Sequence, residues 1–291
     1  MPVITYLEAN PIAFAVGMGM VGLIVGSFLN VVIHRLPKMM EREWRSQCVE
    51  LLAIDEPASE EQPYNLMRPA SHCPACGHAI TALENVPLIS YLVQGGRCTA
   101  CQAHIAIRYP LVELLSGVLA AYAAWHFGIG WQAAGAALLT WALVALSFID
   151  IDHHLLPDTI TLPFLWLGLA FNLFGTFTDT QSSLIGAMVG YSVLWLIYIL
   201  FKLVTGKEGM GYGDFKLLAM LGAWMGWQML PLIILLSALV GAVVGLTLIA
   251  LTGSDKSKPI PFGPYLACAG WIALVWGHNI TQAYLLWATP S

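Results

Sequence analysis

The chain has 291 residues, of which 58% are hydrophobic and only 10% are charged, with a net charge of −5 and a mean hydropathy of +0.73. A soluble protein of this length needs far more polar surface, so the composition excludes an ordinary soluble domain and indicates a membrane protein. We expect the lipid bilayer, and no nucleic acid, among its partners.

The first apolar run begins near residue 13, after the segment MPVITYLEAN. A signal peptide needs a basic amino-terminal region, and this segment contains no Lys or Arg. The run is also longer than a typical apolar signal region. We therefore expect a membrane helix here and not a removable signal peptide.

Long uncharged runs continue to the end of the chain. Because a hydrocarbon core of about 30 Å takes about 20 helical residues, the two longest runs, 114–149 and 217–254, must each contain two helices. Backbone groups in lipid need internal partners, which favours an all-α bundle. We predict about eight transmembrane helices, near 13–33, 109–127, 131–149, 159–177, 182–201, 214–226, 229–251 and 261–282. The sixth is short for a full span and is expected to be tilted or partly re-entrant.

Orientation follows from the basic residues, which all fall on one side of these eight helices. By the positive-inside rule this side is cytoplasmic, so both termini are expected to be periplasmic. The opposite connections, near 128–130, 178–181 and 227–228, contain no Lys or Arg. The twelve basic residues are Arg35, Lys38, Arg42, Arg45, Arg68, Arg97, Arg108, Lys202, Lys207, Lys216, Lys256 and Lys258.

We divide the chain into a first membrane helix at 1–34, a cytoplasmic domain at 35–108 and a seven-helix membrane domain at 109–291. The first half of the cytoplasmic domain is interpreted as a short amphipathic helix followed by an acidic loop. The second half contains four cysteines in the spacing C-x2-C-x21-C-x2-C.

These four residues, Cys73, Cys76, Cys98 and Cys101, have the spacing of two zinc knuckles. Gly77 suits the tight turn of the first knuckle. Four protein ligands leave no open position, so a zinc ion here would be structural and would help a small lobe to fold. The alternative is two disulfides, which are rare in the reducing compartment that the topology predicts.

Ionisable residues at the ends of membrane helices are candidates for function. Two groups lie at the cytoplasmic side: FIDIDHHLLPD, which contains Asp150, and GMGYGDFK, which contains Asp214. Two carboxylates within a few Å share a proton and so present an acid and a base together, as peptide hydrolysis requires. Gly211 and Gly213 would admit an extended substrate or let the turn move.

Less specific interpretations of the neighbouring residues remain open. Asp158 follows Pro157 and could be the N-cap of the next helix. Glu113 could pair with Arg108 or Lys216 in a structural role. Asp152 is as compatible with a supporting role as with catalysis, and together with His153 and His154 it could bind a divalent metal. The G-x-G-x-x-G pattern at residues 17–22 lies inside an apolar span, where close helix packing explains it better than a dinucleotide.

At these residues the chain resembles the type IV prepilin peptidases, bacterial inner-membrane enzymes, over essentially its whole length. The G-x-G-D element alone is weak evidence, but six motifs together are highly specific. They are GSFLNVVIHRLP at 26–37, the four cysteines, RYPLVELL at 108–115, FIDIDHHLLPD at 148–158, GMGYGDFKLLAMLGAW at 209–224 and PIPFGPYLA at 259–267.

The resemblance implies an aspartic endopeptidase whose catalytic residues are Asp150 and Asp214, with Gly211, Gly213 and Lys216 in the substrate loop. It also implies that the enzyme cleaves the basic leader from type IV prepilins and type II secretion pseudopilins at the cytoplasmic membrane face. The longer members of the family then methylate the new N-terminus with S-adenosylmethionine. Acidic residues of 35–108, such as Glu41, Glu43 or Asp55, are candidates to attract the leader.

The residues that bind the methyl donor are not identifiable from the sequence, because no glycine-rich donor pattern is present. Asn30, His34, Arg35 and the pair at 95–96 are suitably placed, and packing or anchoring explains each equally well. Two other classes of function are compatible with the carboxylates: a transporter, against which no inverted repeat is visible, and a metal-dependent membrane enzyme using the Asp and His cluster.

Overall fold

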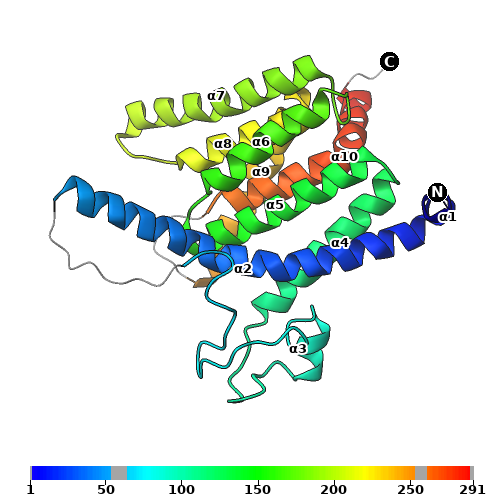
Figure 1. Ribbon diagram of the computed structural model, residues 1–291. Coiled ribbons are helices and arrows are strands. Elements are labelled where there is room, and N and C mark those ends of the chain that lie inside the picture. The colour runs from blue at the N-terminus through cyan, green and yellow to red at the C-terminus, as the bar shows by residue number, and fades with distance from the viewer. Residues whose placement is uncertain (1, 54–63, 253–260, 289–291) are drawn as a thin grey trace. The chain divides into compact units, whose positions relative to one another are not determined.

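The computed structural model describes residues 2–53, 64–252 and 261–288 and is all-helical (Figure 1). Over these ranges the only extended pairing is two isolated bridges, in the cysteine-containing segment. The helices are α1 (Pro2–Ala9), α2 (Pro11–Leu51), α3 (Ile89–Val93), α4 (Arg108–Phe127), α5 (Trp131–His153), α6 (Asp158–Asn172), α7 (Thr180–Thr205), α8 (Tyr212–Met225), α9 (Leu230–Thr252) and α10 (Gly263–Ala288), with a 3₁₀ turn, η1 (Trp227–Met229), before α9.

Each of the eight predicted helices corresponds to a helix of the structure, which confirms the all-α fold. Among the described residues, five helices are long and apolar enough to cross a membrane: α2, α4, α5, α7 and the segment Trp227–Thr247, which covers η1 and most of α9. Helices α6 and α8 have 15 and 14 residues, fewer than the roughly 20 that a full span takes. The sixth predicted helix is therefore short, as expected.

The first membrane helix is longer than predicted. We expected it to end near residue 33 and a separate amphipathic helix to follow, but α2 continues without a break to Leu51. Pro37 lies inside it and removes only one backbone donor, and the Met, Glu, Arg and Gln residues that follow are good helix formers. The predicted acidic loop and Asp55 fall at 54–63, outside the described residues.

The chain divides into two compact units, residues 15–122 and residues 1–14 with 123–291. In the first unit α2 packs closely on α4. A methyl group on Gly22 would lie 2.5 Å from the carbonyl oxygen of Ser116 and 2.8 Å from Cα of Gly117, so no larger residue fits. Gly19 and Gly22 therefore serve helix packing, as predicted for this pattern, whereas a methyl group on Gly17 would meet no described atom within 4 Å.

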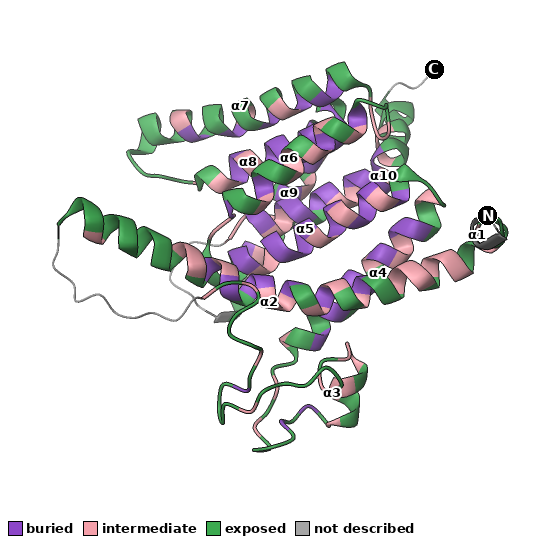
Figure 2. Cartoon of the chain, in the orientation of Figure 1, coloured by how far each residue is buried: buried purple, intermediate pink, exposed green. Residues whose placement is uncertain are grey.

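In the second unit α8 is the innermost helix and packs against α6, α7 and α10 (Figure 2). Every residue from Asp214 to Gly226 is buried except Lys216. Because α8 is surrounded by protein, its polar ends have partners within the bundle and its length does not have to match the bilayer.

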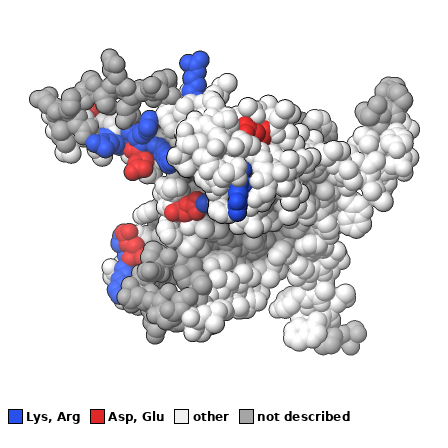
Figure 3. All heavy atoms as spheres, turned by 90° about the horizontal axis from the view of Figure 1, so that it is seen from below, with Lys and Arg blue, Asp and Glu red and all other residues white. Residues whose placement is uncertain are grey.

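The outer helices carry the opposite pattern. Large apolar side chains are exposed along α7, such as Met188 and Leu196, and along α9, such as Leu235 and Leu246. Exposed apolar area on this scale is typical of a lipid-facing surface. Figure 3 shows one face of the molecule, on which charged side chains gather at a few places and most of the surface is uncharged.

Candidate active site and metal centre

Asp150 lies in the last turn of α5 and is buried, with 5% of its surface exposed. The backbone N–H of Gly263, the first residue of α10, donates a hydrogen bond of 2.9 Å to its Oδ2. Gly263 also approaches the carboxylate closely, because a methyl group added there would lie 2.6 Å from Oδ2. The start of α10 therefore fixes the position of the Asp150 carboxylate.

Asp214 lies in the first turn of α8 and is also buried, with 7% of its surface exposed. The bundle brings it near enough to Asp150 for the two carboxylate charges to interact. The sequence placed both at the same side of the membrane domain, and in the structure both are buried. The side chain of Leu156 lies close both to Gly213, the neighbour of Asp214, and to Gly263, which holds Asp150. Two carboxylates in such a site are suited to general acid–base chemistry.

The two glycines before Asp214 have different surroundings. Gly211 is the N-cap of α8 and is exposed. Among the described residues, the atom nearest to a methyl group added there would be Oδ2 of Asp214, at 3.7 Å. Gly213 is already helical, and an added methyl group would lie 2.7 Å from Cβ of Leu156. Gly211 therefore leaves space beside the carboxylate, whereas Gly213 allows the α5–α6 connection to pack against α8.

The interpretation of Asp158 as an N-cap is wrong. Pro157, in an extended conformation, is the N-cap residue of α6, and Asp158 is already in the first turn. Both carboxylate oxygens of Asp158 accept hydrogen bonds of 2.7 Å from Nζ of Lys216. The carboxylate of Asp158 is therefore paired with a lysine on a neighbouring helix, and no local sequence pattern predicts this partner.

Glu113 does not pair with Lys216, which is bound to Asp158. Its Oε2 instead accepts a 2.9 Å hydrogen bond from the backbone N–H of Leu88. Leu88 is the residue just before α3 and has a positive φ of 59°. Glu113 is buried in α4, so it connects the cysteine-containing segment to a membrane helix.

The Asp and His cluster after Asp150 is not a metal site in this structure. Asp152, His153 and His154 are all exposed. Within the described ranges, the one group of three or more possible ligands consists of the four cysteines. His154 has a left-handed conformation and ends α5 by donating its backbone N–H to the carbonyl of Asp150.

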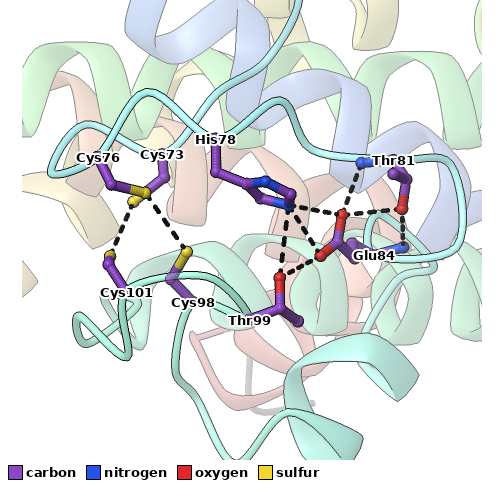
Figure 4. A network of polar contacts seen from close by, with 8 residues as sticks. All are labelled: Cys73, Cys76, His78, Thr81, Glu84, Cys98, Thr99 and Cys101. Atoms are coloured by element: carbon purple, nitrogen blue, oxygen red, sulfur yellow. Dashed lines mark hydrogen bonds and ion pairs between the residues drawn. The ribbon is translucent and has the colours of Figure 1, made fainter.

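The four cysteine sulfurs lie within 4.8 Å of one another (Figure 4). Sγ of Cys73 is 3.8 Å from that of Cys101, and Sγ of Cys76 is 4.0 Å from that of Cys98. Four thiolates at 2.3 Å from a tetrahedral zinc ion are separated by about 3.8 Å, so the geometry fits one ion. All six cysteines of the chain are free, and the alternative of two disulfides is not realised.

Both cysteine pairs have the same backbone structure. The N–H of Cys73 donates to the carbonyl of His78, and that of Cys98 donates to the carbonyl of Ala103. The fifth residue of each turn has a positive φ, 73° at Gly77 and 60° at Gln102. The role predicted for Gly77 is confirmed, and its equivalent in the second turn is a glutamine.

The local electrostatics suit a cation. Backbone N–H groups of Ala75 and Cys76 point at the Cys73 sulfur and lower its pKa to about 7. The N–H groups of Cys101 and Ala100 lower the pKa of Cys98 in the same way. The backbone N–H of His78 acts to lower the pKa of Cys76, but the adjacent Cys101 thiol raises it to about 12. A positive ion at the centre of the four sulfurs would offset the repulsion between their thiolates.

The polar residues that sequence reasoning named near the methyl donor make structural contacts. Asn30 donates a 3.0 Å hydrogen bond to the carbonyl of Tyr109, and Arg35 donates one of 3.0 Å to the carbonyl of Asn65. Nε2 of His34 is 3.0 Å from Nζ of Lys38. No donor site can be assigned from these contacts.

Three functional or supporting residues were missed from the sequence. Gly263 lies in the motif PIPFGPYLA, but no role was predicted for it, because its contact with Asp150 is made by its backbone. Asn172 is buried at the end of α6 and donates to the last carbonyls of α8. Glu84 stands in the pattern Thr81-x-x-Glu84, which is that of a capping box and could have been recognised.

Comparisons with known proteins cover nearly the whole chain. Residues 20–127 match the profile described as Bacterial Peptidase A24 N-terminal domain, and residues 137–246 match that of the Type IV leader peptidase family. A protein of Pseudomonas aeruginosa named prepilin leader peptidase/N-methyltransferase is 58% identical over 288 residues, covering 99% of both chains.

Proteins with the same name from Aeromonas hydrophila and Neisseria gonorrhoeae are similar as well. The first is 61% identical and covers 90% of this chain and 91% of its own. The second is 47% identical and covers 95% of this chain and 96% of its own. No solved structure matches significantly.

Proposed function

The chain belongs to the type IV leader peptidase family, and from this premise we propose that it removes the leader from type IV prepilins and type II secretion pseudopilins. It then methylates the new amino-terminal residue with S-adenosylmethionine. The observation that supports the peptidase half is that the carboxylates of Asp150 and Asp214 are both buried, with Leu156 beside the glycine next to each of them, Gly263 and Gly213.

We propose that these two aspartates are the catalytic pair. One carboxylate is ionised and takes a proton from a water molecule as the water oxygen attacks the carbonyl carbon of the scissile peptide bond. The other is protonated and donates its proton to the carbonyl oxygen, and a proton then passes to the leaving amine as the C–N bond breaks. The backbone N–H of Gly263 keeps Asp150 in place throughout.

The residues of the substrate loop have separate roles in this proposal. Gly211 leaves room for an extended substrate beside Asp214, since an added methyl group there meets no atom closer than 3.7 Å. Because Gly213 has no side chain, Leu156 can pack against α8 at this position. Lys216 acts indirectly, because it is bound to Asp158.

The metal centre is proposed to hold one structural zinc ion on Cys73, Cys76, Cys98 and Cys101. Sulfur spacings of 3.8 and 4.0 Å and backbone donors aimed at two of the sulfurs support it. When bound, the ion supplies a fixed charge that holds the four thiolates together. S-adenosylmethionine is the methyl donor in the methyl transfer that we propose.

The location proposed is the bacterial inner membrane. We keep the division into residues 1–34, 35–108 and 109–291, with about eight spans, both termini periplasmic, and the metal centre and aspartates on the cytoplasmic side. The distribution of Lys and Arg supports this topology. Of these basic residues, Lys256 and Lys258 lie outside the described ranges.

The test is to incubate purified protein with a prepilin peptide and a labelled methyl donor, and to follow leader loss and methyl gain separately by mass spectrometry. Asp150→Asn and Asp214→Asn should each reduce cleavage by at least about 10²–10⁴-fold, the usual contribution of a general acid or base. Methylation of a peptide that already lacks its leader should continue in both variants. Cleavage at the wild-type rate in either variant would refute the pair.

A further inference from the structure

Glu84 lies between the two cysteine turns and contacts both of them (Figure 4). On the side of the first turn, Nε2 of His78 is 3.2 Å from Oε1 of Glu84, and His78 is two residues beyond Cys76. On the side of the second turn, the hydroxyl of Thr99, the residue after Cys98, donates to the same oxygen. One carboxylate therefore joins the residues that adjoin two of the four cysteines.

The carboxylate is itself held in place by its own turn. Its Oε2 accepts hydrogen bonds of 2.8 Å from both the backbone N–H and the hydroxyl of Thr81. The N–H of Glu84 lies 3.4 Å from the same hydroxyl, which completes a reciprocal capping box. The carboxyl group is mostly buried, with 18% of its side chain exposed. A side chain fixed in this way has little freedom to follow either turn if that turn moves.

Among the described residues, few other hydrogen bonds join the two turns. Each turn is closed on itself by an isolated bridge, His72 with Ala79 and Arg97 with His104. Apart from the sulfur atoms, a direct contact between the turns is that of the Thr99 hydroxyl with Nε2 of His78, at 3.4 Å. The separation of the turns, and with it the spacing of the sulfurs, therefore depends strongly on Glu84.

We propose that Glu84 is a positioning residue that holds the two cysteine turns at the separation required by a single zinc ion. The inference rests on the proposed zinc site and adds to it the residue that determines how firmly the ion is retained. Hydrogen-bonded groups outside the ligand set typically change metal affinity by about 10–100-fold when they are removed.

The experiment measures the rate of zinc release from the full-length protein in detergent to an excess of a colorimetric chelator. Glu84→Ala removes the contacts of the carboxylate with both turns. Thr99→Val removes only the hydrogen bond to the second turn, with little change in side-chain volume. Thr99→Ser restores the hydroxyl, and Glu50→Ala is the matched control, because Glu50 is an exposed glutamate on α2. Cobalt substitution gives an absorption spectrum that reports whether four thiolates still bind.

We expect zinc release to be about 10-fold faster or more in Glu84→Ala and Thr99→Val, with Thr99→Ser and Glu50→Ala unchanged and the four-thiolate cobalt spectrum retained. The rescue by serine distinguishes positioning from a general loss of stability. If Glu84→Ala does not fold, the Thr99 pair decides the question alone.

Release at the wild-type rate from both Glu84→Ala and Thr99→Val would overturn the role of Glu84 while leaving the zinc site intact. A wild-type protein that contains no zinc would overturn the zinc site, and the role of Glu84 with it. The two failures are therefore distinguishable, and neither touches the proposed aspartate pair.

Discussion

Replacing Gly263 by alanine tests whether the start of α10 positions the carboxylate of Asp150, which we propose to be catalytic. The added methyl group would lie 2.6 Å from Oδ2 and 3.1 Å from Cγ of Asp150, and 3.1 Å from Cδ2 of Leu156. An ordinary contact of a Cβ atom begins at about 3.4 Å. The carboxylate, the helix start or both must therefore move apart by about 0.8 Å.

A displacement of this size should lower the rate of cleavage much more than it lowers the stability of the fold. A shift of about 1 Å at a reacting group can lower the rate by about 10²-fold, which corresponds to about 2.7 kcal/mol in the activation free energy. The hydrogen bond from the Gly263 N–H to Asp150 is weakened in the same step. We therefore expect kcat for leader cleavage to fall by about 10²-fold.

The assay is leader cleavage from a prepilin peptide, with KM determined beside kcat. Gly17→Ala is the control, because a methyl group added at Gly17 in α2 meets no atom within 4 Å. The control should cleave normally, and Gly263→Ala should still methylate a peptide without a leader. Normal kcat in Gly263→Ala, with the protein folded, would refute the inference that this backbone contact positions Asp150.

Three further changes test the surroundings of the site. Asn172→Ala should lower the free energy of unfolding by about 1–3 kcal/mol, measured by denaturation in detergent, because buried carbonyls of α8 lose their donor. Lys216→Ala should cost at most about 1 kcal/mol, because the ion pair is partly exposed; a large loss of cleavage without a loss of stability would instead indicate direct contact with substrate. Asp179 is the N-cap of α7, and the side chain and backbone N–H of Ser182 lower its pKa. The stability that the ionised Asp179 contributes is therefore present above about pH 4 and is lost as the pH falls through the lowered folded-state pKa. Asp179→Ala should therefore lower the unfolding temperature at pH 7 and have a smaller effect below pH 4.

The sequence predicted well what depends on local pattern. Runs of apolar residues predicted the helices because each span must be continuous in lipid. The C-x2-C spacing predicted the cluster of four cysteines, because both thiolates of a turn must reach one ion in a zinc site. Asp150 and Asp214 were selected because ionisable residues at the ends of membrane helices are candidates for function, and both are buried in the structure.

Contacts between distant segments were not predictable in the same way. Asp158 looked like an N-cap because Pro and Thr flank it, yet its partner is Lys216 on another helix. Gly263 acts on Asp150 through its backbone, which all residue types except proline share. The continuation of α2 through Pro37 depends on the residues after it, whose high helix propensity offsets the loss of one hydrogen bond.

The depth of Asp214 in the bundle depends on how α8 is held, because α8 is too short for the bilayer to set its position. Helix α6 runs beside it in the same direction and contacts it at both ends. At the site end, Asp158 binds Lys216 at 2.7 Å. At the far end, Asn172 donates hydrogen bonds of 2.8 and 2.9 Å to the carbonyls of Ala223 and Trp224. Because α8 is rigid between these two points, a change at Asn172 would shift Asp214 along the helix axis. Cleavage should therefore be sensitive to a residue at the opposite end of α8 from the proposed catalytic pair.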